Sequence, residues 1–560
     1  MVADVNPQLT RLLVCARARG PELLACTCAL AWFLYLGNGP TLKPTFITWL
    51  WRDDWAAYYW GFSFFRNAPW AWPLGNVPNL FYPLGTSVGF TDANPWLSVL
   101  FKLLSPILPR DFQFFGFWLL LCFLLQAWFG AQIGRALTRD PVRIALAGAL
   151  FATTPVLPLR VRHIALCGLF FVTAGVWLNL KRVDGPRAAR RDLVTSWLLL
   201  IWAAGTHAYL SVMLLALCCA FYARLTFVER LLPARQLVLS LVIAFAGSLG
   251  CYYLFGFIGW QRTDLAVEGF GVYSADLSTL FNPLGLSRLV PALPVQTAQW
   301  EGFAYLGLGT LALLCLCLAR VVRAPGAWLG GVRRQWPLLL VVVASFVYAL
   351  SNQISWCSRL VADLSALYAP FAQLTGTFRS SGRFAWLLHL SLIALAIRAS
   401  ELPAYPRLSR VLLALALALS VVEQDANQYQ ITGPSPPRLA DPAWNGVGRE
   451  YDHLAIIPIQ LQWECPYSEQ LVNAFSQLAY RERMTLNSGN FMRKPPGVRT
   501  LCNEEPRVLD GRTIYVVEEG RVGAMRGRHA ACGLLETLNV CVLEGRRTDF
   551  SRALERSVER

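Results

Sequence analysis

The stretch Phe112–Gly134 reads FQFFGFWLLLCFLLQAWFGAQIG and contains no charged residue. It is long enough to cross a membrane as one helix, which takes about 20 mostly apolar residues. Several other runs approach this length. Of the 560 residues, 55% are hydrophobic and 15% are charged, and the mean hydropathy is +0.42. Because soluble proteins carry about 25% charged residues, the composition predicts a polytopic membrane protein.

Eleven apolar runs are candidates for transmembrane helices, and six clusters of basic residues lie between or before them. All six clusters fall on one side of the membrane if the eleven spans are correct. The positive-inside rule then places the N-terminus in the cytoplasm and the C-terminus outside. The first run has a basic flank but no convincing cleavage site before Pro40, so we expect an uncleaved anchor. The predicted spans are 21–39, 112–134, 142–158, 164–181, 193–207, 208–225, 237–258, 302–320, 337–351, 384–399 and 408–423. The clusters are Arg11, Arg17 and Arg19; Arg135, Arg139 and Arg143; Lys181, Arg182, Arg187, Arg190 and Arg191; Arg224, Arg230 and Arg235; Arg320, Arg323, Arg333 and Arg334; and Arg398, Arg407 and Arg410.

The basic excess of the chain belongs to the membrane part. The net charge is +16 and the pI is about 9.4, but residues 425–560 contain 17 basic and 17 acidic residues. The excess therefore lies in the loops between spans. A surface that binds nucleic acid would instead gather basic residues on one soluble face, so we expect no nucleic-acid partner.

The composition changes after Val422. Residues 424–445 are rich in Pro, Asn, Gln and Asp, which predicts a linker. In residues 446–560 short apolar runs alternate with a helical pattern across 467–483, which predicts a small α/β domain outside the membrane. An even number of cysteines in an oxidising compartment favours one or two disulfides, with free buried thiols as the alternative. These cysteines are Cys465, Cys502, Cys532 and Cys541. Residues 1–423 form the membrane domain in this division.

The longest predicted loop between spans, 40–111, carries an adjacent pair of carboxylates. They lie in Trp51–Trp60, which reads WRDDWAAYYW. Asp53 and Asp54 repel each other, and such a pair suits proton abstraction from a hydroxyl or the binding of a cation. Alternatively, Asp54 caps a helix that begins at Trp55. The following stretch, Trp60–Arg66, predicts an amphipathic helix lying on the membrane.

Further polar residues lie in the predicted external turns. Asp92 precedes Asn-Pro, which favours a fixed turn that either directs a functional carboxylate or only stabilises the turn. Arg160, Arg162 and His163 lie in a very short external turn, against the positive-inside bias, so we expect an anion such as phosphate there.

A second basic motif, Thr377–Arg383, precedes a predicted span. Its Arg379 and Arg383 flank hydroxyls and a glycine, which suits phosphate binding at a helix N-terminus. The alternative is arginines that extend to the membrane interface. Three further external candidates either contact sugar hydroxyls or have a structural role at the ends of spans. They are His207, Asp276 and Glu301.

Together these features resemble the GT-C superfamily of integral-membrane glycosyltransferases, which use sugars linked to polyprenyl phosphate. The acidic pair lies where that superfamily keeps an acidic motif in its first external loop, and the segment Tyr82–Pro95 resembles uncharacterised bacterial members. The C-terminal part has no Trp-Trp-Asp sequence, which argues against protein N-glycosylation. No motif for a nucleotide phosphate is present, which favours a lipid-linked donor.

The resemblance implies an all-α domain of about eleven spans with an α/β domain on the outer face of a bacterial inner membrane. It also implies an inverting transfer to a glycan, lipid or protein acceptor, with Asp53 or Asp54 as general base. The leaving lipid phosphate would be stabilised by arginine side chains. These are Arg66, Arg160, Arg162, Arg379 and Arg383. No cofactor is required, although the acidic pair with Asp92 could hold a divalent cation.

Two other classes of function stay open. A transporter or flippase for a lipid-linked saccharide would also need many spans, but transporters place ionisable groups near the middle of the bilayer. Here the acidic residues gather outside the apolar runs, apart from Glu22 and Glu423 at the ends of two predicted spans. A scaffold of the cell envelope, with the C-terminal domain as a docking module, would leave the acidic pair without a role.

Overall fold

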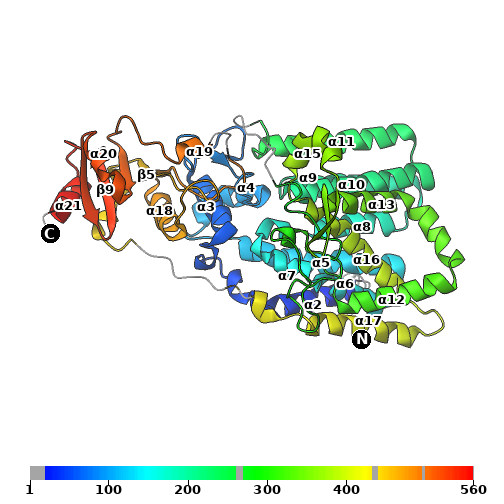
Figure 1. Ribbon diagram of the computed structural model, residues 1–560. Coiled ribbons are helices and arrows are strands. Elements are labelled where there is room, and N and C mark those ends of the chain that lie inside the picture. Colours follow the sequence, from blue (N-terminus) through cyan, green and yellow to red (C-terminus); the bar gives the residue numbers. More distant parts are fainter. Residues whose placement is uncertain (1–18, 260–268, 430, 432–438, 495–497, 559–560) are drawn as a thin grey trace, which may run out of the picture. The chain divides into compact units, whose positions relative to one another are not determined.

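The computed structural model describes residues 19–259, 269–429, 431, 439–494 and 498–558 (Figure 1). Arg11, Arg17 and part of the predicted linker lie outside these residues. The chain divides into two compact units. The helical unit comprises residues 1–43, 114–249 and 265–431, and the mixed unit comprises 44–113, 250–264 and 432–560.

The helical unit contains a helix at each predicted apolar run. Six helical stretches of the described chain are long and apolar enough to cross a membrane, so the protein is a multi-pass membrane protein. They are Phe115–Leu137, Pro141–Arg162, Ala208–Val228, Ala234–Leu254, Trp328–Leu350 and Ser381–Ala399. The remaining apolar helices are shorter or more charged, and the number of eleven spans stays a prediction. The helices are α2 (Gly20–Tyr35), α5 (Phe115–Leu137), α6 (Pro141–Ala152), α8 (Phe170–Leu180), α9 (Gly185–Ala204), α10 (Ala208–Ala223), α11 (Ala234–Leu254), α12 (Leu308–Arg323), α13 (Gly326–Leu350), α16 (Ala385–Ala399) and α17 (Pro406–Val422).

Small residues let three of these helices approach closely. A side chain at Gly148 of α6 would lie 2.5 Å from the Cβ of Ala25 in α2 and 2.6 Å from the carbonyl oxygen of Ala127 in α5. A side chain at Gly134 would lie 2.9 Å from the Cβ of Ala147. Van der Waals packing of this kind associates helices where lipid removes the hydrophobic driving force.

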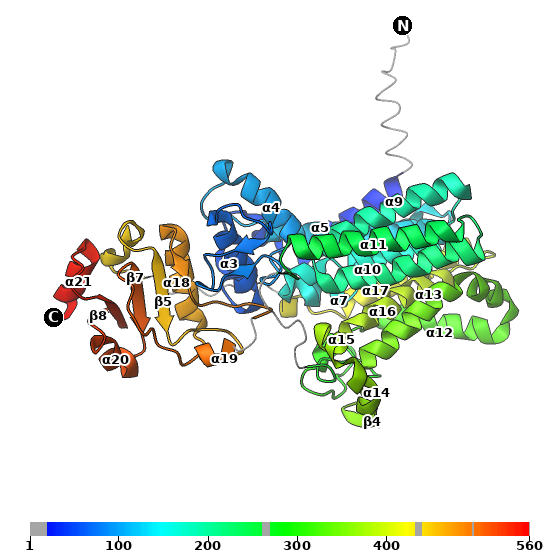
Figure 2. The same ribbon diagram turned by 90° about the horizontal axis from the view of Figure 1, so that it is seen from above.

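Short elements connect the helices of this unit. After α6 come α7 (Val156–Leu159), η4 (Arg160–Arg162) and η5 (Ile164–Cys167), and η7 (Gln299–Gly302) precedes α12. Between α13 and α16 lie the hairpin β3 (Gln353–Trp356) and β4 (Arg359–Asp363), then α14 (Ser365–Tyr368), α15 (Ala372–Thr377) and η9 (Ser381–Phe384). Figure 2 shows β4, α14 and α15 grouped together.

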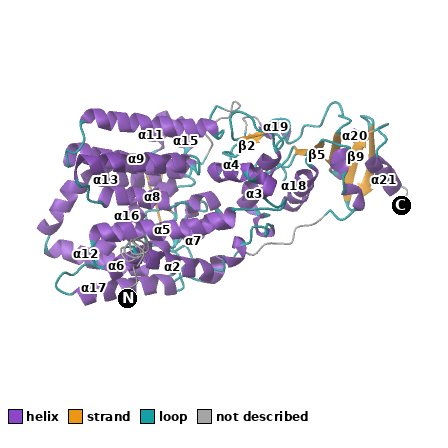
Figure 3. Ribbon diagram, turned by 180° about the vertical axis from the view of Figure 1, so that it is seen from behind, coloured by secondary structure: helices purple, strands orange, loops and turns teal. Residues whose placement is uncertain are grey.

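The mixed unit is built on a five-stranded sheet in the order β6-β5-β7-β9-β8 (Figure 3). β5 pairs in parallel with β6 and β7, and β9 pairs antiparallel with β7 and β8. One or two disulfides are predicted, and two form, Cys465–Cys502 and Cys532–Cys541. The strands are β5 (His453–Ile457), β6 (Thr485–Leu486), β7 (Thr513–Val517), β8 (Ala530–Leu535) and β9 (Leu538–Leu543); the helices are α18 (Glu469–Glu482), α19 (Val498–Leu501), α20 (Val522–Arg526) and α21 (Asp549–Val558).

The first loop folds together with the C-terminal part. It contains α3 (Asp53–Asn67), β1 (Asn76–Val77), β2 (Thr86–Ser87) and α4 (Pro95–Leu103). In α3 the Trp60 indole N–H donates to Asn473 Oδ1 at 2.7 Å, and the Asn473 amide donates to the carbonyl of Trp51 at 2.8 Å. This division differs from the predicted one, in which residues 40–111 belonged to the membrane domain, because these contacts link segments far apart in the sequence.

The expectation that Trp60–Arg66 lies on the membrane surface is wrong. This stretch is the C-terminal half of α3, and Phe62, Phe64 and Phe65 are each 0% exposed. Apolar side chains occur all around this part of the helix, and a helix that is apolar on every side is buried rather than amphipathic.

Candidate functional site

The predicted acidic pair lies in the first turn of α3. The helix begins at Asp53 rather than at Trp55, and its N-cap residue, Arg52, makes no side-chain cap bond. The predicted capping role of Asp54 is therefore wrong. Asp53 is exposed and Asp54 is half-buried. Two carboxylates in a first turn gain from the partial positive charge of the helix N-terminus, which offsets part of their mutual repulsion.

Two side chains of the C-terminal part hold the backbone of Asp53. Its N–H donates to the carboxylate of Glu469, and its carbonyl accepts from the Asn490 amide at 3.2 Å. The φ angle of Asp53 is +47°. A non-glycine residue in this left-handed region costs of order 1–3 kcal/mol and persists where surrounding bonds determine it. Glu469 and Asn490 lie 416 and 437 residues from Asp53, and no pattern in the sequence linked them to it.

Negative charge dominates around the start of α3. We call the four residues Asp53, Asp54, Tyr467 and Glu469 the acidic corner. Burial, and then the charges of Glu469, Asp53 and Asp54, raise the pKa of the Tyr467 phenol. Burial also raises the pKa of Glu469, and the charge of Asp53 adds to this effect, against the Asp53 N–H and the charge of Arg52. The phenol therefore stays protonated, and Glu469 takes up a proton more readily than an ordinary glutamate.

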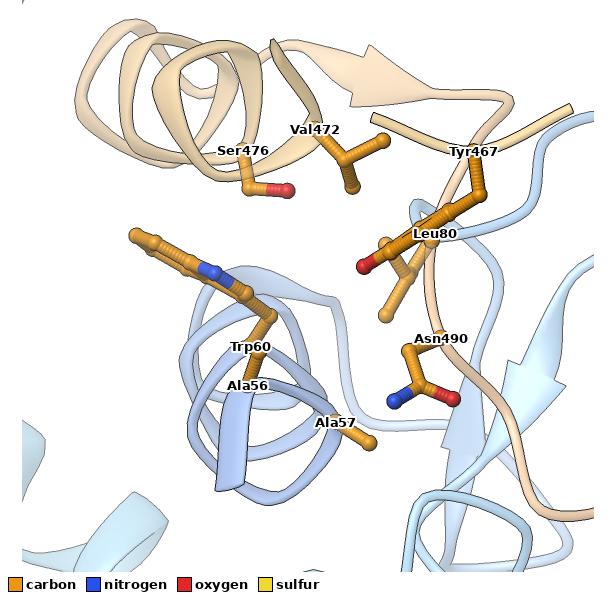
Figure 4. Close-up of a pocket in the computed structure, with 9 residues that line it drawn as sticks. Ala56, Ala57, Trp60, Leu80, Tyr467, Val472, Ser476 and Asn490 are labelled. Atoms are coloured by element: carbon orange, nitrogen blue, oxygen red, sulfur yellow. The ribbon is translucent and has the colours of Figure 1, made fainter. Parts of the chain in front are cut away.

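A small pocket opens beside the acidic corner, between α3 and α18 (Figure 4). Its empty space, open solvent included, is about 240 Å³. Ala56, Ala57 and Trp60 of α3 line one side. Trp60 follows Ala56 by four residues and Ala57 by three, so these three lie on one face of the helix that Asp53 begins. The remaining lining residues are Leu80, Tyr467, Val472, Ser476, Gly489 and Asn490.

In the helical unit the structure brings together four of the predicted residues. The Glu301 carboxylate accepts two bonds from Arg383, at 3.0 and 2.9 Å, and one from Arg160 at 2.9 Å. Arg160 also donates to the backbone carbonyl of Glu301 at 2.7 Å, and His163 Nε2 lies 3.9 Å from the carboxylate. The exposed fractions of the Arg160, Glu301 and Arg383 side chains are 1%, 6% and 10%. We call these four residues the Glu301 cluster.

The Glu301 cluster carries one more positive than negative charge, without counting His163. Burial opposes ionisation of Glu301, but the charges of Arg383 and Arg160 hold the pKa of its carboxyl well below its usual range. The Arg160 guanidinium lies 5.0 Å from the Trp386 ring centre, and that of Arg383 lies 4.7 Å from the Tyr209 ring centre. Cation–π contacts of this kind stabilise desolvated guanidiniums.

Three other predicted residues make bonds that favour a structural role. Arg66 donates to four backbone carbonyls of residues 105–110, so it ties the end of α3 to this segment. The ring of His207 accepts from the N–H of Tyr209 at 3.2 Å and caps α10. The Asp276 carboxylate, 1% exposed, accepts four bonds from Ser278, Ser355 and Cys357.

The remaining predicted residues are Asp92, Arg379 and Arg162. Asp92, half-buried, has a φ of +51° in the turn before α4. Arg379 lies 5.2 Å from the Tyr273 ring centre, and Arg162 is exposed beside the Glu301 cluster in the chain. Among the described residues, no group of three or more His, Cys, Asp or Glu side chains is arranged to hold a metal ion. Substrate binding by Asp92, Arg162 and Arg379 stays a prediction.

Comparison with known families gives two matches. A model described as a domain of unknown function (DUF6311) matches residues 26–425, and a model described as the DUF6311 C-terminal domain matches residues 443–543. No curated protein matches the chain.

Two solved structures are similar to the chain. One is the archaeal oligosaccharyltransferase AglB from Archaeoglobus fulgidus in complex with an inhibitory peptide and a dolichol-phosphate, at 13% identity and a TM-score of 0.37. The other is the Archaeoglobus fulgidus oligosaccharyltransferase tethered with an acceptor peptide containing the NVT sequon via a disulfide bond, at 13% identity and a TM-score of 0.42. Each match covers 85% of this chain, which spans 65% and 64% of theirs, less than two thirds. A likeness this low carries no argument about activity.

Proposed function

The chain belongs to the DUF6311 family, and we propose that it is a glycosyltransferase which moves a sugar from a polyprenyl-phosphate donor to an acceptor hydroxyl. The acceptor is a glycan, a lipid or a protein of the cell envelope. The reaction takes place at the outer face of a bacterial inner membrane, with the N-terminus in the cytoplasm and the C-terminal part outside. This orientation follows from the distribution of basic residues between the spans.

The observation that carries the proposal is the acidic corner. Asp53 and Asp54 are held in one helical turn, in a protein whose net charge is +16. Two side chains over 400 residues away hold the backbone of Asp53 in a left-handed conformation. Strained backbone of this kind gathers at functional sites. Since Asp53 begins the helix whose following turns line the pocket, we assign it as the general base and Asp54 as its neighbour.

The proposed reaction is a single displacement. The acceptor oxygen attacks the anomeric carbon while Asp53 takes the proton of the acceptor hydroxyl. The bond from the anomeric carbon to the phosphate oxygen breaks, and the lipid phosphate leaves with that electron pair. One displacement inverts the configuration of the anomeric carbon. Because a phosphate already accepts negative charge, the proposal requires no cofactor, and a divalent cation near the corner remains an option for the same chemistry.

The Glu301 cluster is the proposed source of positive charge for the lipid phosphate. Its arginines, Arg160 and Arg383, exceed the charge of Glu301 by one. Fixed positive charge in a desolvated place stabilises a leaving anion more than it would in water. Arg162 and Arg379 add to this role in the proposal.

Separate Asp53→Asn and Asp54→Asn variants test the base. Membranes with each variant are given a polyprenyl-phosphate sugar, and transfer to endogenous acceptors is measured. We expect Asp53→Asn to lose most of the transfer and Asp54→Asn to keep more. Asp549→Asn is the matched control, because the side chain of this aspartate is exposed at the start of α21. Full transfer by both variants would overturn the assignment, and a carrier that only moves a lipid-linked saccharide would show no transfer in the wild-type chain either.

A further inference from the structure

The segment between α13 and α16 exposes a group of large apolar side chains. We call six of its residues the apolar patch, and their exposed fractions lie between 47% and 66%. From residue 353 to residue 374 the chain has only two charged side chains, Arg359 and Asp363. Single exposed apolar residues are normal, but a grouped set marks a surface that meets a partner. The patch consists of Trp356 of β3, Leu360 and Val361 of β4, Leu367 of α14, Phe371 of η8 (Ala369–Phe371) and Leu374 of α15.

Hydrogen bonds to Asp276 hold the hairpin of this segment in place. The Asp276 carboxylate accepts from the Ser355 hydroxyl at 2.8 Å and from the Cys357 N–H at 3.1 Å. Neighbouring residues of a strand point to opposite faces. Because Ser355 faces Asp276, Trp356 points away from it, and its ring is left exposed. The fold therefore holds this side of the hairpin outward.

Aromatic contacts link α14 to the C-terminal end of α13. The ring centre of Phe270 lies 5.7 Å from that of Tyr348 in α13 and 5.2 Å from that of Tyr368 in α14. The N–H of Leu364, just before α14, donates to the carbonyl of Asn352 at 2.6 Å. These contacts keep the patch next to the end of a candidate membrane span.

The patch also begins and ends close to candidate spans in the sequence. The hairpin starts three residues after α13 ends at Leu350, and α15 ends at Thr377, four residues before the stretch Ser381–Ala399. Figure 2 shows β4 and α14 projecting sideways from the helices of this unit, and not past their ends. Membrane-spanning helices run on average about 20° from the bilayer normal. A sideways projection therefore points toward the surrounding lipid.

The exposed surface of α13 is apolar up to this point. Leu340, Val343 and Val347 are exposed and are spaced by three and four residues, so they lie on one face of the helix. In a span, an exposed apolar face of this kind meets lipid. The contacts from Tyr348 through Phe270 to α14 lead from this part of α13 to the patch. The patch therefore continues a surface that lipid covers.

Backbone and charge limit the depth of the patch in the bilayer. Within the described chain, the sheet of β3 and β4 has two strands, so each strand has one edge without a neighbouring strand. Open sheet edges do not occur in the hydrocarbon region, where water cannot satisfy them. Arg359 and Asp363 are exposed and need a polar environment. Trp side chains are enriched at the headgroup level, which suits Trp356.

We propose that the apolar patch docks on the bilayer around the helical unit, at the boundary between phospholipid headgroups and acyl chains. The leaflet is the one at the C-terminal end of α13. This inference is independent of the proposed transfer. It has a consequence for the motif Thr377–Arg383, which begins at the last residue of α15. The docked patch keeps this motif at the level of the lipid headgroups.

Photo-crosslinking from single positions tests the proposal. Leu360, Leu367 or Leu374 of the full chain is replaced by p-benzoylphenylalanine, which reacts with nearby C–H bonds. The chain is irradiated in nanodiscs of phosphatidylethanolamine and phosphatidylglycerol, and mass spectrometry identifies the adducts. We expect phospholipid adducts at all three positions and at Val343, the reference in α13. We expect none at Arg526, which is exposed on α20.

Three results would overturn the proposal. The first is a phospholipid adduct at Val343 and none at the patch. The second is adducts of the patch with other segments of the chain or with a second copy, since protein would then cover it. The third is adducts that form only after a polyprenyl phosphate is added to the nanodiscs, because the patch would then hold that lipid and not the bilayer.

A charged variant provides a second measurement. Val361→Asp combined with Phe371→Asp adds two carboxylates that favour water over lipid. We expect the yield of the adduct at Leu367 to fall relative to the yield at Val343. Val361→Met combined with Phe371→Leu is the matched control and should keep the ratio. An unchanged ratio in the aspartate variant would overturn the proposal, because apolar side chains would then not hold this surface on lipid.

Discussion

The acidic corner and the Glu301 cluster both place carboxylates near arginines, but they balance charge in opposite ways. Glu301 is enclosed by Arg160 and Arg383, and their charges hold its pKa low against the effect of burial. In the acidic corner burial raises the pKa of Glu469, with Asp53 adding to the rise and the charge of Arg52 opposing it. A neutralised carboxylate stabilises a fold, whereas one short of positive charge is suited to accept a proton. The comparison separates a carboxylate that its arginines keep ionised from one that takes up a proton more readily.

Replacing the proposed base should have the largest effect. We expect Asp53→Asn to lower kcat by about 10²–10⁴-fold, the usual contribution of a positioned base, with the thermal unfolding midpoint unchanged. Initial rates of transfer check the fall in kcat, and circular-dichroism melting of the same preparations checks the unfolding midpoint. A fall in the midpoint that matches the fall in kcat would place Asp53 with the structural carboxylates.

Replacing Glu301 should lower the stability of the fold, whereas replacing Asp53 should lower kcat. Glu301→Ala leaves Arg160 and Arg383 buried without their counter-ion, and breaking a buried pair in this way costs about 3–5 kcal/mol. The yield of folded chain in detergent and its unfolding midpoint report the loss. Glu555→Gln, at an exposed position of α21, is the control. A folded Glu301→Ala chain with the wild-type midpoint would contradict the structural role.

The two glutamates should also give stability opposite pH dependences. The pKa of Glu469 is raised on folding, so its favourable contribution is present at low pH and is lost as the pH rises through the folded pKa. Glu469→Gln should therefore gain stability over wild type between acidic and neutral pH. The lowered pKa of Glu301 makes its contribution present above the usual carboxyl range and lost only on acidification. Melting curves from pH 2 to 8 check the signs, and a Glu469→Gln advantage that shrinks toward neutral pH would reverse the assignment.

The smallest effect is expected at the exposed neighbour of the Glu301 cluster. Arg162 is exposed, and Arg162→Gln should change the free energy of unfolding by no more than about 0.5 kcal/mol. Chemical denaturation compared with wild type measures this. A loss comparable to that of Glu301→Ala would show that the cluster extends to Arg162.

The sequence indicated many of these residues but not their arrangement. Arg160, His163, Glu301 and Arg383 were each identified from their loops, because charged residues beside apolar runs are conspicuous. The contacts among these four residues were not predicted, because hydrophobic periodicity does not determine which helix ends are neighbours in space. The even cysteine count predicted one or two disulfides, but neither their pairing nor that two would form.

The two wrong predictions about the first loop have a common cause, which is packing between segments far apart in the sequence. Trp60–Arg66 resembled a surface helix because its partner, Asn473, lies 413 residues away. Asp54 resembled a helix cap because the hydrogen bonds that hold the Asp53 backbone come from Glu469 and Asn490. No local pattern connects these two residues to the first loop. The carboxylate pair could be identified from the sequence because its two residues are adjacent in the chain.

The interleaved composition of the mixed unit has a consequence for biosynthesis. Residues 44–113 leave the ribosome early, and their partners in 432–560 leave it last. At typical translation rates the first loop waits on the order of tens of seconds for the strands and helix that cover α3. During that interval the nascent chain presents the aromatic residues of α3 without their final partners. A chain truncated before residue 432 therefore contains the apolar helices and a first loop that lacks its C-terminal partners. Such a loop is prone to aggregate.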